Sequence, residues 1–302
     1  MAALSILRPG LFTTIQDLGR WGLQSRGVPV SGAMDWYSHR LANGLLKNDS
    51  TLATLEVTLM GPYVQFDAGS AFAVAGAEFD LTLDDAPVEM NTAIEARPGA
   101  VLRFGPRRYG ARAYIAVTGG VDVPKVLGSR STHALTAMGG HEGRSLRAGD
   151  TIRVGNRSDA PGPTSAMTSR PLPLTGSHAR LRMIPADQQL AARLTEHRFR
   201  VSTRSDRMGY RLEGATVDAA PGEMVSVAIP TGAIQVPPTG QPILLMNDHA
   251  TTGGYAIAGT VITADLPLAG QLAPGDSIEF EACSIDTARA ALHQREAALD
   301  AG

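Results

Sequence analysis

The sequence predicts a mainly β fold with a few covering helices. Short apolar or alternating runs recur between glycine-rich turns, and this spacing suits a β-barrel or a β-sandwich. Glycine accounts for 33 of the 302 residues and aromatic residues for only 5%, which is consistent with closely packed strands and tight turns. The clearest strand-like runs are residues 72–75, 79–83, 101–104 and 114–117.

Three helices are expected, each with a residue at its start that favours a helix N-terminus. Asp35 and Asp286 suit the positive end of a helix dipole, and Pro185 suits a first helical turn. The first helix also places Leu41 and Leu45 four positions apart, on one face. The predicted helical segments are residues 35–46, 185–194 and 286–299.

The length of 302 residues favours two domains over one. Proline, glycine and serine break every periodic pattern in residues 158–178, which we interpret as a linker. The linker separates an N-terminal β-rich subdomain, residues 1–157, from a C-terminal β-rich subdomain, residues 179–302, which ends in a helix.

Each half closes with a similar phrase. Residues 146–154 read LRAGDTIRV, and residues 272–280 read LAPGDSIEF. A Gly-Asp turn that leads into an alternating strand fits both copies. We interpret the two phrases as matching final strands of related β-rich units, and chance resemblance of a common turn is the alternative.

The composition argues against several kinds of partner and compartment. A formal net charge of −2 and a pI of about 6.4 do not suggest a nucleic-acid or anionic-membrane surface. Cys283 is the only cysteine, which excludes an internal disulfide and fits a reducing compartment. No segment approaches the ~20 apolar residues of a membrane span, and the N-terminal residues contain no signal-peptide core. A cytoplasmic location is expected.

Several common catalytic motifs are missing from the sequence. Lys47 and Lys125, the only lysines, complete neither a P-loop nor the Met-Lys-Met site of a covalently carried biotin. No Gly-x-Ser-x-Gly elbow occurs. His133, His141 and His249 have no metal-site spacing, so no metal is expected.

Residues 232–255 form the most informative segment, because packing alone does not generate its composition. The apolar runs 243–246 and 261–263 predict buried strands that hold a polar, glycine-rich loop. Asp248 is the first candidate catalytic residue, as a proton acceptor, because it follows a buried run and is expected beside hydroxyls and a phenol rather than a cation cluster. The backbone of residues 252–254 would stabilise developing oxygen charge. A simple polar turn is the alternative. The candidate substrate-binding residues of this segment are Gln235, Thr252, Gly253, Gly254 and Tyr255.

A second candidate loop carries Arg204, Asp206 and Arg207. Two flanking arginines favour the charged form of the aspartate. Asp206 is therefore the second candidate catalytic residue, expected to bind or orient a substrate that Arg207 helps to hold. A structural ion pair explains the same pattern equally well.

Two further groups of polar residues precede these loops. Glycine turns in residues 119–144 can form an anion-binding nest, to which Arg130 or Arg144 would add bidentate recognition, although turn geometry alone is the alternative. Asp17 and Arg20 are expected to fix a loop, and Glu56 is expected to be structural.

Six separated segments match motifs of one known family: residues 8–20, 31–35, 119–132, 142–144, 205–214 and 234–255. The chain resembles the family that contains the C-type subunit of 5-oxoprolinase (the Kip antagonist), the second subunit of allophanate hydrolase and the C-terminal part of the urea carboxylase carboxyltransferase domain. Two positions depart from the family pattern, because His141 replaces an expected apolar residue and His249 an expected arginine.

The resemblance implies a cyclophilin-like β-barrel architecture and a function that needs partner chains. It implies a subunit of an ATP-dependent 5-oxoprolinase that hydrolyses 5-oxo-L-proline to L-glutamate with Kip-inhibitor-like and LamB-like subunits. ATP is expected at the level of the complex, since this chain lacks a nucleotide motif. Two alternatives stay open: a biotin-dependent carboxyltransferase acting on a urea-like nitrogen, and a non-catalytic regulator of the Kip-inhibitor-like protein.

Overall fold

A computed structural model describes residues 2–156, 171–173, 176–218 and 225–300. The chain forms two compact units, the first comprising Met1–Arg20, Ser31–Leu174 and Ala298–Gly302, and the second Trp21–Val30 and Thr175–Ala297. The predicted linker, residues 158–178, lies outside the described residues except for 171–173 and 176–178. No helix in the described part of the chain has the length and apolar composition needed to cross a membrane.

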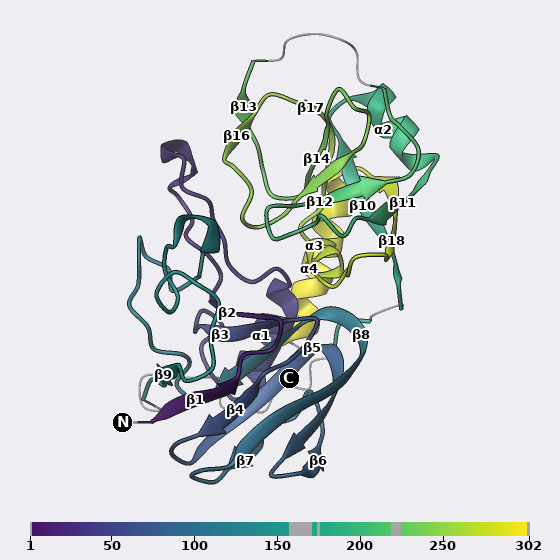
Figure 1. The fold of residues 1–302 in the computed structure, drawn as a ribbon. Coiled ribbons are helices and arrows are strands. Elements are labelled where there is room, and N and C mark those ends of the chain that lie inside the picture. Colours follow the sequence, from purple (N-terminus) through teal and green to yellow (C-terminus); the bar gives the residue numbers. More distant parts are fainter. Residues whose placement is uncertain (1, 157–170, 174–175, 219–224, 301–302) are drawn as a thin grey trace. The chain divides into compact units, whose positions relative to one another are not determined.

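The first unit is built on one antiparallel sheet of nine strands (Figure 1). The strands follow the order β2-β3-β8-β4-β1-β9, and β5 pairs with β6, β7 and β8. Their bounds are β1 (Ala3–Arg8), β2 (Phe12–Gln16), β3 (Thr54–Thr58), β4 (Tyr63–Phe66), β5 (Ser70–Leu83), β6 (Ala86–Val88), β7 (Ile94–Ala96), β8 (Val101–Val117) and β9 (Thr151–Arg153).

Two long strands replace the four short ones predicted in this region. Residues 72–75 and 79–83 both belong to β5, and residues 101–104 and 114–117 both belong to β8. The β5–β8 register shifts between Gly76 and Leu81, so bulges bend one continuous ladder instead of ending it. The polar stretches between the runs were wrongly interpreted as turns.

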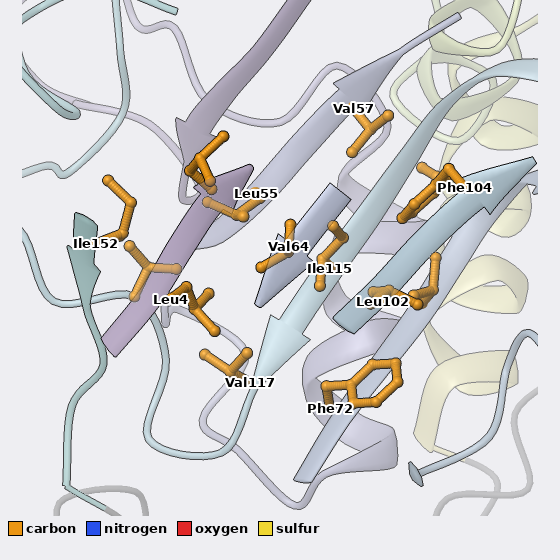
Figure 2. Close-up of a cluster of buried hydrophobic side chains, with 14 of the residues drawn as sticks. Leu4, Leu55, Val57, Val64, Phe72, Leu102, Phe104, Ile115, Val117 and Ile152 are labelled. Atoms are coloured by element: carbon orange, nitrogen blue, oxygen red, sulfur yellow. The ribbon is translucent and has the colours of Figure 1, made fainter. Parts of the chain in front are cut away.

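One hydrophobic cluster forms the core of the first unit. Alternate residues of its strands point to the same face and bury aliphatic and aromatic side chains together. Figure 2 shows these side chains meeting across the strands, among them Leu4, Leu55, Val64, Phe72, Ile115 and Ile152.

Helix α1 (Trp36–Leu45) packs on β5 and β8 of the first unit. The predicted start is confirmed, because Asp35 is the N-cap and its Oδ1 accepts a hydrogen bond from the Ser38 amide at 2.9 Å. Two short 3-10 helices also occur, η1 (Gln24–Arg26) and η2 (Ala134–Thr136).

The second unit is a closed barrel, which confirms the prediction of a mainly β fold of the barrel type. Seven strands close it in the order β10-β17-β14-β15-β12-β11-β18, and a separate pair, β13 and β16, lies beside β14 and β17 in Figure 1. The bounds are β10 (His178–Pro185), β11 (Arg198–Val201), β12 (Gly209–Glu213), β13 (Val227–Ala228), β14 (Ala233–Val236), β15 (Ile243–Leu245), β16 (Thr252–Gly253), β17 (Ala256–Val261) and β18 (Ser277–Ala282).

Three α-helices begin in the second unit: α2 (Gln188–Thr195), α3 (Leu266–Gly270) and α4 (Ile285–Asp300). The predicted start of α2 at Pro185 is wrong, since Pro185 is the last residue of β10. Asp187 caps α2 instead, accepting hydrogen bonds from the amides of Gln189 and Leu190 at 2.9 and 3.0 Å.

The two repeated phrases form the same turn before the last strand of each unit. Gly149 and Gly275 have φ angles of 92° and 94°, and each donates its amide hydrogen at 2.8 Å to a neighbouring strand, β1 or β11. Asp150 and Asp276 each accept from the backbone amide three residues earlier, at 2.7 and 2.8 Å. The predicted correspondence is therefore confirmed at the level of hydrogen bonds.

Candidate functional site

A cavity of about 250 Å³ lies on the outer face of the second unit's barrel wall. Three adjacent strands place Gln235 of β14, Ile243 of β15 and Arg211 of β12 side by side, because Ile243 is in register with both of the others. Leu244, next to Ile243, is fully buried in the barrel. Since side chains alternate along a strand, the three residues face away from the barrel interior and line the cavity.

The cavity combines an apolar wall with a charged rim. Ile229, Ile243 and Leu245 supply aliphatic surface. Arg204, Asp206 and Arg211 also line it, and these three residues are exposed. A second wall comes from the β13–β16 pair, because Ile229 directly follows β13 and Thr252 lies in β16. Such a combination of apolar surface and a few convergent polar groups is typical of a small-molecule site.

Gln235 is a buried polar residue in the wall of this cavity. Its residue surface is only 6% exposed, and its Nε2 has no hydrogen-bond partner among the described residues. Buried amide donors are nearly always paired, so an unpaired one at a cavity marks a place where a ligand acceptor fits.

His249 also lines the cavity, and its tautomer follows from its neighbours. Its Nδ1 lies 2.7 Å from the carbonyl oxygen of Ala250 and must donate there, so its Nε2 accepts the hydroxyl hydrogen of Thr231 at 3.1 Å. Burial lowers the pKa of His249 below its ordinary value, despite the backbone hydrogen bond and the nearby Asp248. The imidazole is therefore neutral at physiological pH.

Asp248 and Arg207 form a buried ion pair, which corrects two expectations. The Arg207 Nε lies 2.9 Å from Asp248 Oδ2, and its Nη2 lies 3.2 Å from Oδ1. We expected Asp248 to lie away from cations and Arg207 to flank the Asp206 carboxylate. Asp206 instead accepts from the amides of Met208 and Gly209, at 2.8 and 3.3 Å.

The physical reason for this exchange of partners is strand pairing. β12 pairs antiparallel with β15, so Arg207, shortly before β12, lies beside Asp248, shortly after β15. The backbone then joins them as well, because the Asp248 amide donates to the Arg207 carbonyl at 2.9 Å. Both carboxylate oxygens of Asp248 are engaged by the guanidinium, an arrangement that suits holding Arg207 better than accepting a proton.

The structure gathers only part of the predicted site. Asp206, Gln235 and Thr252 line the cavity, whereas the Arg207–Asp248 pair does not. Gly253 belongs to β16, beside Gln235, and is followed by Gly254 and the half-exposed Tyr255.

Arg130 lies in the first unit and belongs to a different network. Its amide donates to Asp17 Oδ2 at 2.6 Å, and its guanidinium pairs with Asp122 at 3.1 Å. The hydroxyls of Ser129 and Ser131 donate to Asp17 Oδ1, both at 2.6 Å. Burial alone would raise the pKa of Asp17, but these hydrogen bonds hold it below its ordinary value. Together with the bond from Arg20 to the Ser131 carbonyl, they fix the loop, as expected of Asp17 and Arg20.

A second buried polar cluster in the first unit is also structural. Glu56 accepts hydrogen bonds from the Met34 amide and the Tyr114 hydroxyl, each at 2.9 Å. Burial, followed by the charges of Glu56 and Asp35, raises the pKa of Tyr114. These residues are fully enclosed, which supports the structural interpretation of Glu56. Within the described residues, no group of three or more His, Cys, Asp or Glu side chains could hold a metal ion.

Sequence reasoning missed Arg211, Ile229 and His249 as cavity residues. Arg211 alternates with the buried Tyr210 and Leu212, a signal of an outward-facing position in a strand. Nothing local in the sequence indicates that Ile229 approaches the same face, because the β13–β16 pairing brings it there.

Comparison with known proteins places the chain in a family. Residues 26–282 match the family model described as carboxyltransferase domain, subdomain A and B, and the chain belongs to this family. Within it, the chain is a homologue of the C-type subunit of 5-oxoprolinase. The Haemophilus influenzae protein of that name is 38% identical over 294 residues, 95% of this chain and 93% of the relative. The Escherichia coli K12 protein is 36% identical and covers 94% and 93%.

A solved structure confirms the fold. The crystal structure of Kluyveromyces lactis urea amidolyase matches 99% of this chain with a TM-score of 0.93 at 32% identity, although the match covers only 20% of the amidolyase chain. The predicted family resemblance is therefore confirmed.

Proposed function

We propose that this chain is one subunit of an ATP-dependent 5-oxoprolinase that hydrolyses 5-oxo-L-proline to L-glutamate. The supporting observation is the extent of the homology. The match to the C-type subunit of 5-oxoprolinase spans 93% of the relative, whereas the match to the amidolyase covers a fifth of that chain. The chain thus corresponds to nearly all of a relative that is itself a subunit, and to only one portion of the large multidomain enzyme.

The chemistry explains why partner chains and ATP belong to the proposal. A five-membered lactam is a stable amide, and phosphorylation of its oxygen would activate the ring carbon toward water. Cleavage of the C–N bond would then give an acyl phosphate, whose hydrolysis would release L-glutamate and inorganic phosphate. Neither lysine of this chain stands in a P-loop, so we assign ATP binding to the complex. The proposed partners are a Kip-inhibitor-like and a LamB-like subunit, in the cytoplasm.

Within this complex, we propose that the cavity beside Gln235 contributes to the substrate site. Asp206 and Thr252 belong to its lining, and the Arg207–Asp248 pair supports the loops on which that lining lies. Asp248 then acts as a positioning residue, in place of the proton acceptor expected from the sequence.

A biotin-dependent carboxyltransferase acting on a urea-like nitrogen is the second candidate. The TM-score of 0.93 with urea amidolyase favours it. Carboxylated biotin would have to arrive on another chain, because neither lysine lies in the Met-Lys-Met context of an attachment site.

Reconstitution from purified subunits separates these functions. ADP release that depends on 5-oxo-L-proline, in a mixture of all three subunits, is the expected result. Consumption of carboxylated biotin without such ADP release would replace the first function by the second. Tight binding of the Kip-inhibitor-like subunit with turnover of neither substrate would instead indicate a regulatory protein.

A further inference from the structure

The wall of the cavity contains a hydrogen-bond donor that no described protein group satisfies. The Gln235 Nε2 is buried and has no partner among the described residues, although Gln235 lies in the cavity wall. A carbonyl oxygen is the simplest uncharged acceptor for an amide N–H, and a site that leaves such a donor unpaired discriminates strongly against ligands without one.

Gly253 packs directly against this donor and against Ile229, with no room for a side chain between them. A Cβ atom at this position would lie 2.9 Å from Gln235 Nε2 and 2.5 Å from Ile229 Cδ1. Gly253 is not among the glycines with positive φ, so its backbone conformation does not demand glycine. Glycine is therefore required at position 253 because a side chain there would clash with Gln235 and Ile229, two residues of the cavity wall.

The rim of the cavity favours an anion. Arg204 and Arg211 contribute two positive charges, against the single carboxylate of Asp206. That carboxylate already accepts two backbone hydrogen bonds, from Met208 and Gly209. Guanidinium groups recognise carboxylates well, through paired N–H donors. Between the rim and Gln235 lies Ile243, whose aliphatic side chain suits the carbon skeleton of a ligand.

We propose that this cavity binds a small cyclic amide that carries a carboxylate. The lactam oxygen accepts from Gln235 Nε2, the ring methylenes contact Ile229 and Ile243, and the carboxylate pairs with Arg211 at the rim. 5-Oxoproline has all three features. Urea lacks the anion and the carbon skeleton, whereas carboxylated biotin carries its carboxylate on the ureido nitrogen of a larger, fused ring system. The inference rests on the proposed function and specifies the substrate contacts within it.

The test measures the lactam contact and the carboxylate contact separately, in the reconstituted complex. KM is measured for 5-oxo-L-proline, and Ki for 2-pyrrolidinone, a lactam that lacks the carboxylate. Gln235→Glu removes the donor, so it should raise both constants by about tenfold or more. Arg211→Ala should raise the KM by about tenfold yet change the Ki by less than about twofold, because only the carboxylate contact is lost. Arg211→Lys should recover part of the loss.

Two matched controls lie on the same unit. Gln189→Glu changes an exposed glutamine on α2, and Arg200→Ala changes an exposed arginine on β11, and neither residue lines the cavity. Both should leave KM and Ki unchanged. Gly253→Ala is a second probe that keeps Gln235 itself, and it should raise both constants because its methyl group would clash with the amide.

The results distinguish this inference from the function on which it rests. An active complex whose KM and Ki stay within about twofold in all cavity variants would overturn the inference and leave the 5-oxoprolinase function intact. If the complex turns over no 5-oxoproline, binding of 5-oxoproline to the full chain decides by ligand-observed NMR. Binding that Gln235→Glu abolishes supports the cavity assignment, and absence of binding to the unaltered chain overturns it.

Discussion

Arg207 and Asp248 tie together two segments of the second unit. Their side chains are 9% and 7% exposed, and two hydrogen bonds join the guanidinium to the carboxylate. Removal of one partner leaves an uncompensated buried charge, which is far more unfavourable than the loss of an exposed ion pair. Loss of this ion pair is therefore expected to lower the stability of the second unit, and to lower turnover as a consequence of that instability.

The first prediction concerns this pair. Asp248→Ala should lower the free energy of unfolding by about 3–5 kcal/mol, while the double variant Asp248→Leu with Arg207→Met should recover most of the loss because both charges are gone. Urea unfolding measures both effects. Asp248→Asn with normal stability and assembly but no turnover would instead show that Asp248 is the proton acceptor expected from the sequence.

The second prediction concerns His39, a fully buried residue of α1. Burial lowers the pKa of His39 to about 4, although the charges of Asp17 and Glu56 oppose this shift. The unfolded chain takes up a proton near pH 6.5 and the folded chain does not, so stability is present above that pH and declines as the pH falls toward about 4.

Urea unfolding at pH 7 and pH 5 tests the prediction. Between these pH values, His39→Gln should lose about 2 kcal/mol less stability than the unaltered chain. His293→Gln, a change of an exposed histidine on α4, should behave like the unaltered chain. Equal pH dependence in the unaltered chain and His39→Gln would show that His39 does not titrate in this way.

At the scale of single residues, the polar composition of residues 232–255 predicted some of the cavity residues but not which side chains contact one another. Gln235 and Thr252 could be predicted because a polar loop between apolar strands needs an explanation beyond packing. The partner of Asp248 could not be predicted, because it depends on the pairing of β12 with β15 and not on neighbours in the sequence. Contacts between loops follow from register, which a single sequence specifies only weakly.

Among the elements, the paired Gly-Asp turns give the third prediction. Gly149 and Gly275 both have positive φ, and a Cβ added to either would meet no atom within 4 Å. Replacement by alanine should therefore lower stability only through backbone strain, by about 1–2 kcal/mol at each site.

Gly140 provides the contrast in a thermal unfolding series. Its φ is 56°, and an added Cβ would lie 1.9 Å from the Thr132 hydroxyl oxygen, so Gly140→Ala should be more destabilising than either turn variant. Similar losses at Gly149 and Gly275 support the equivalence of the turns. A loss at either that matches Gly140→Ala would contradict it.

Whether a segment forms a helix or a strand was more predictable than the length of that helix or strand. Capping chemistry located α1 correctly, because Asp35 and the following apolar spacing agree. Strand length in β5 and β8 was not predictable from local runs, since bulges carry the ladder through polar residues. Pro185 gave a wrong helix start, because it ends β10 and the N-cap of α2 is Asp187, two residues later.

At the scale of the whole molecule, the fold explains how the second unit forms a cavity on its barrel wall. Closure of the second barrel buries one face of β12, β14 and β15 and leaves the other face available, where the β13–β16 pair adds a second wall. Neither wall contains a nucleotide motif. The proposed function therefore assigns the ATP chemistry to partner subunits and the contacts with the ligand to this chain.

The rate of glutamate formation from 5-oxo-L-proline and ATP tests the proposed function most directly. It is measured in the complete three-subunit mixture and in the same mixture without this chain. We expect ATP-dependent glutamate formation only when this chain is present, with one ADP released for each lactam opened. Equal rates with and without the chain, or no glutamate in the complete mixture, would contradict the proposal.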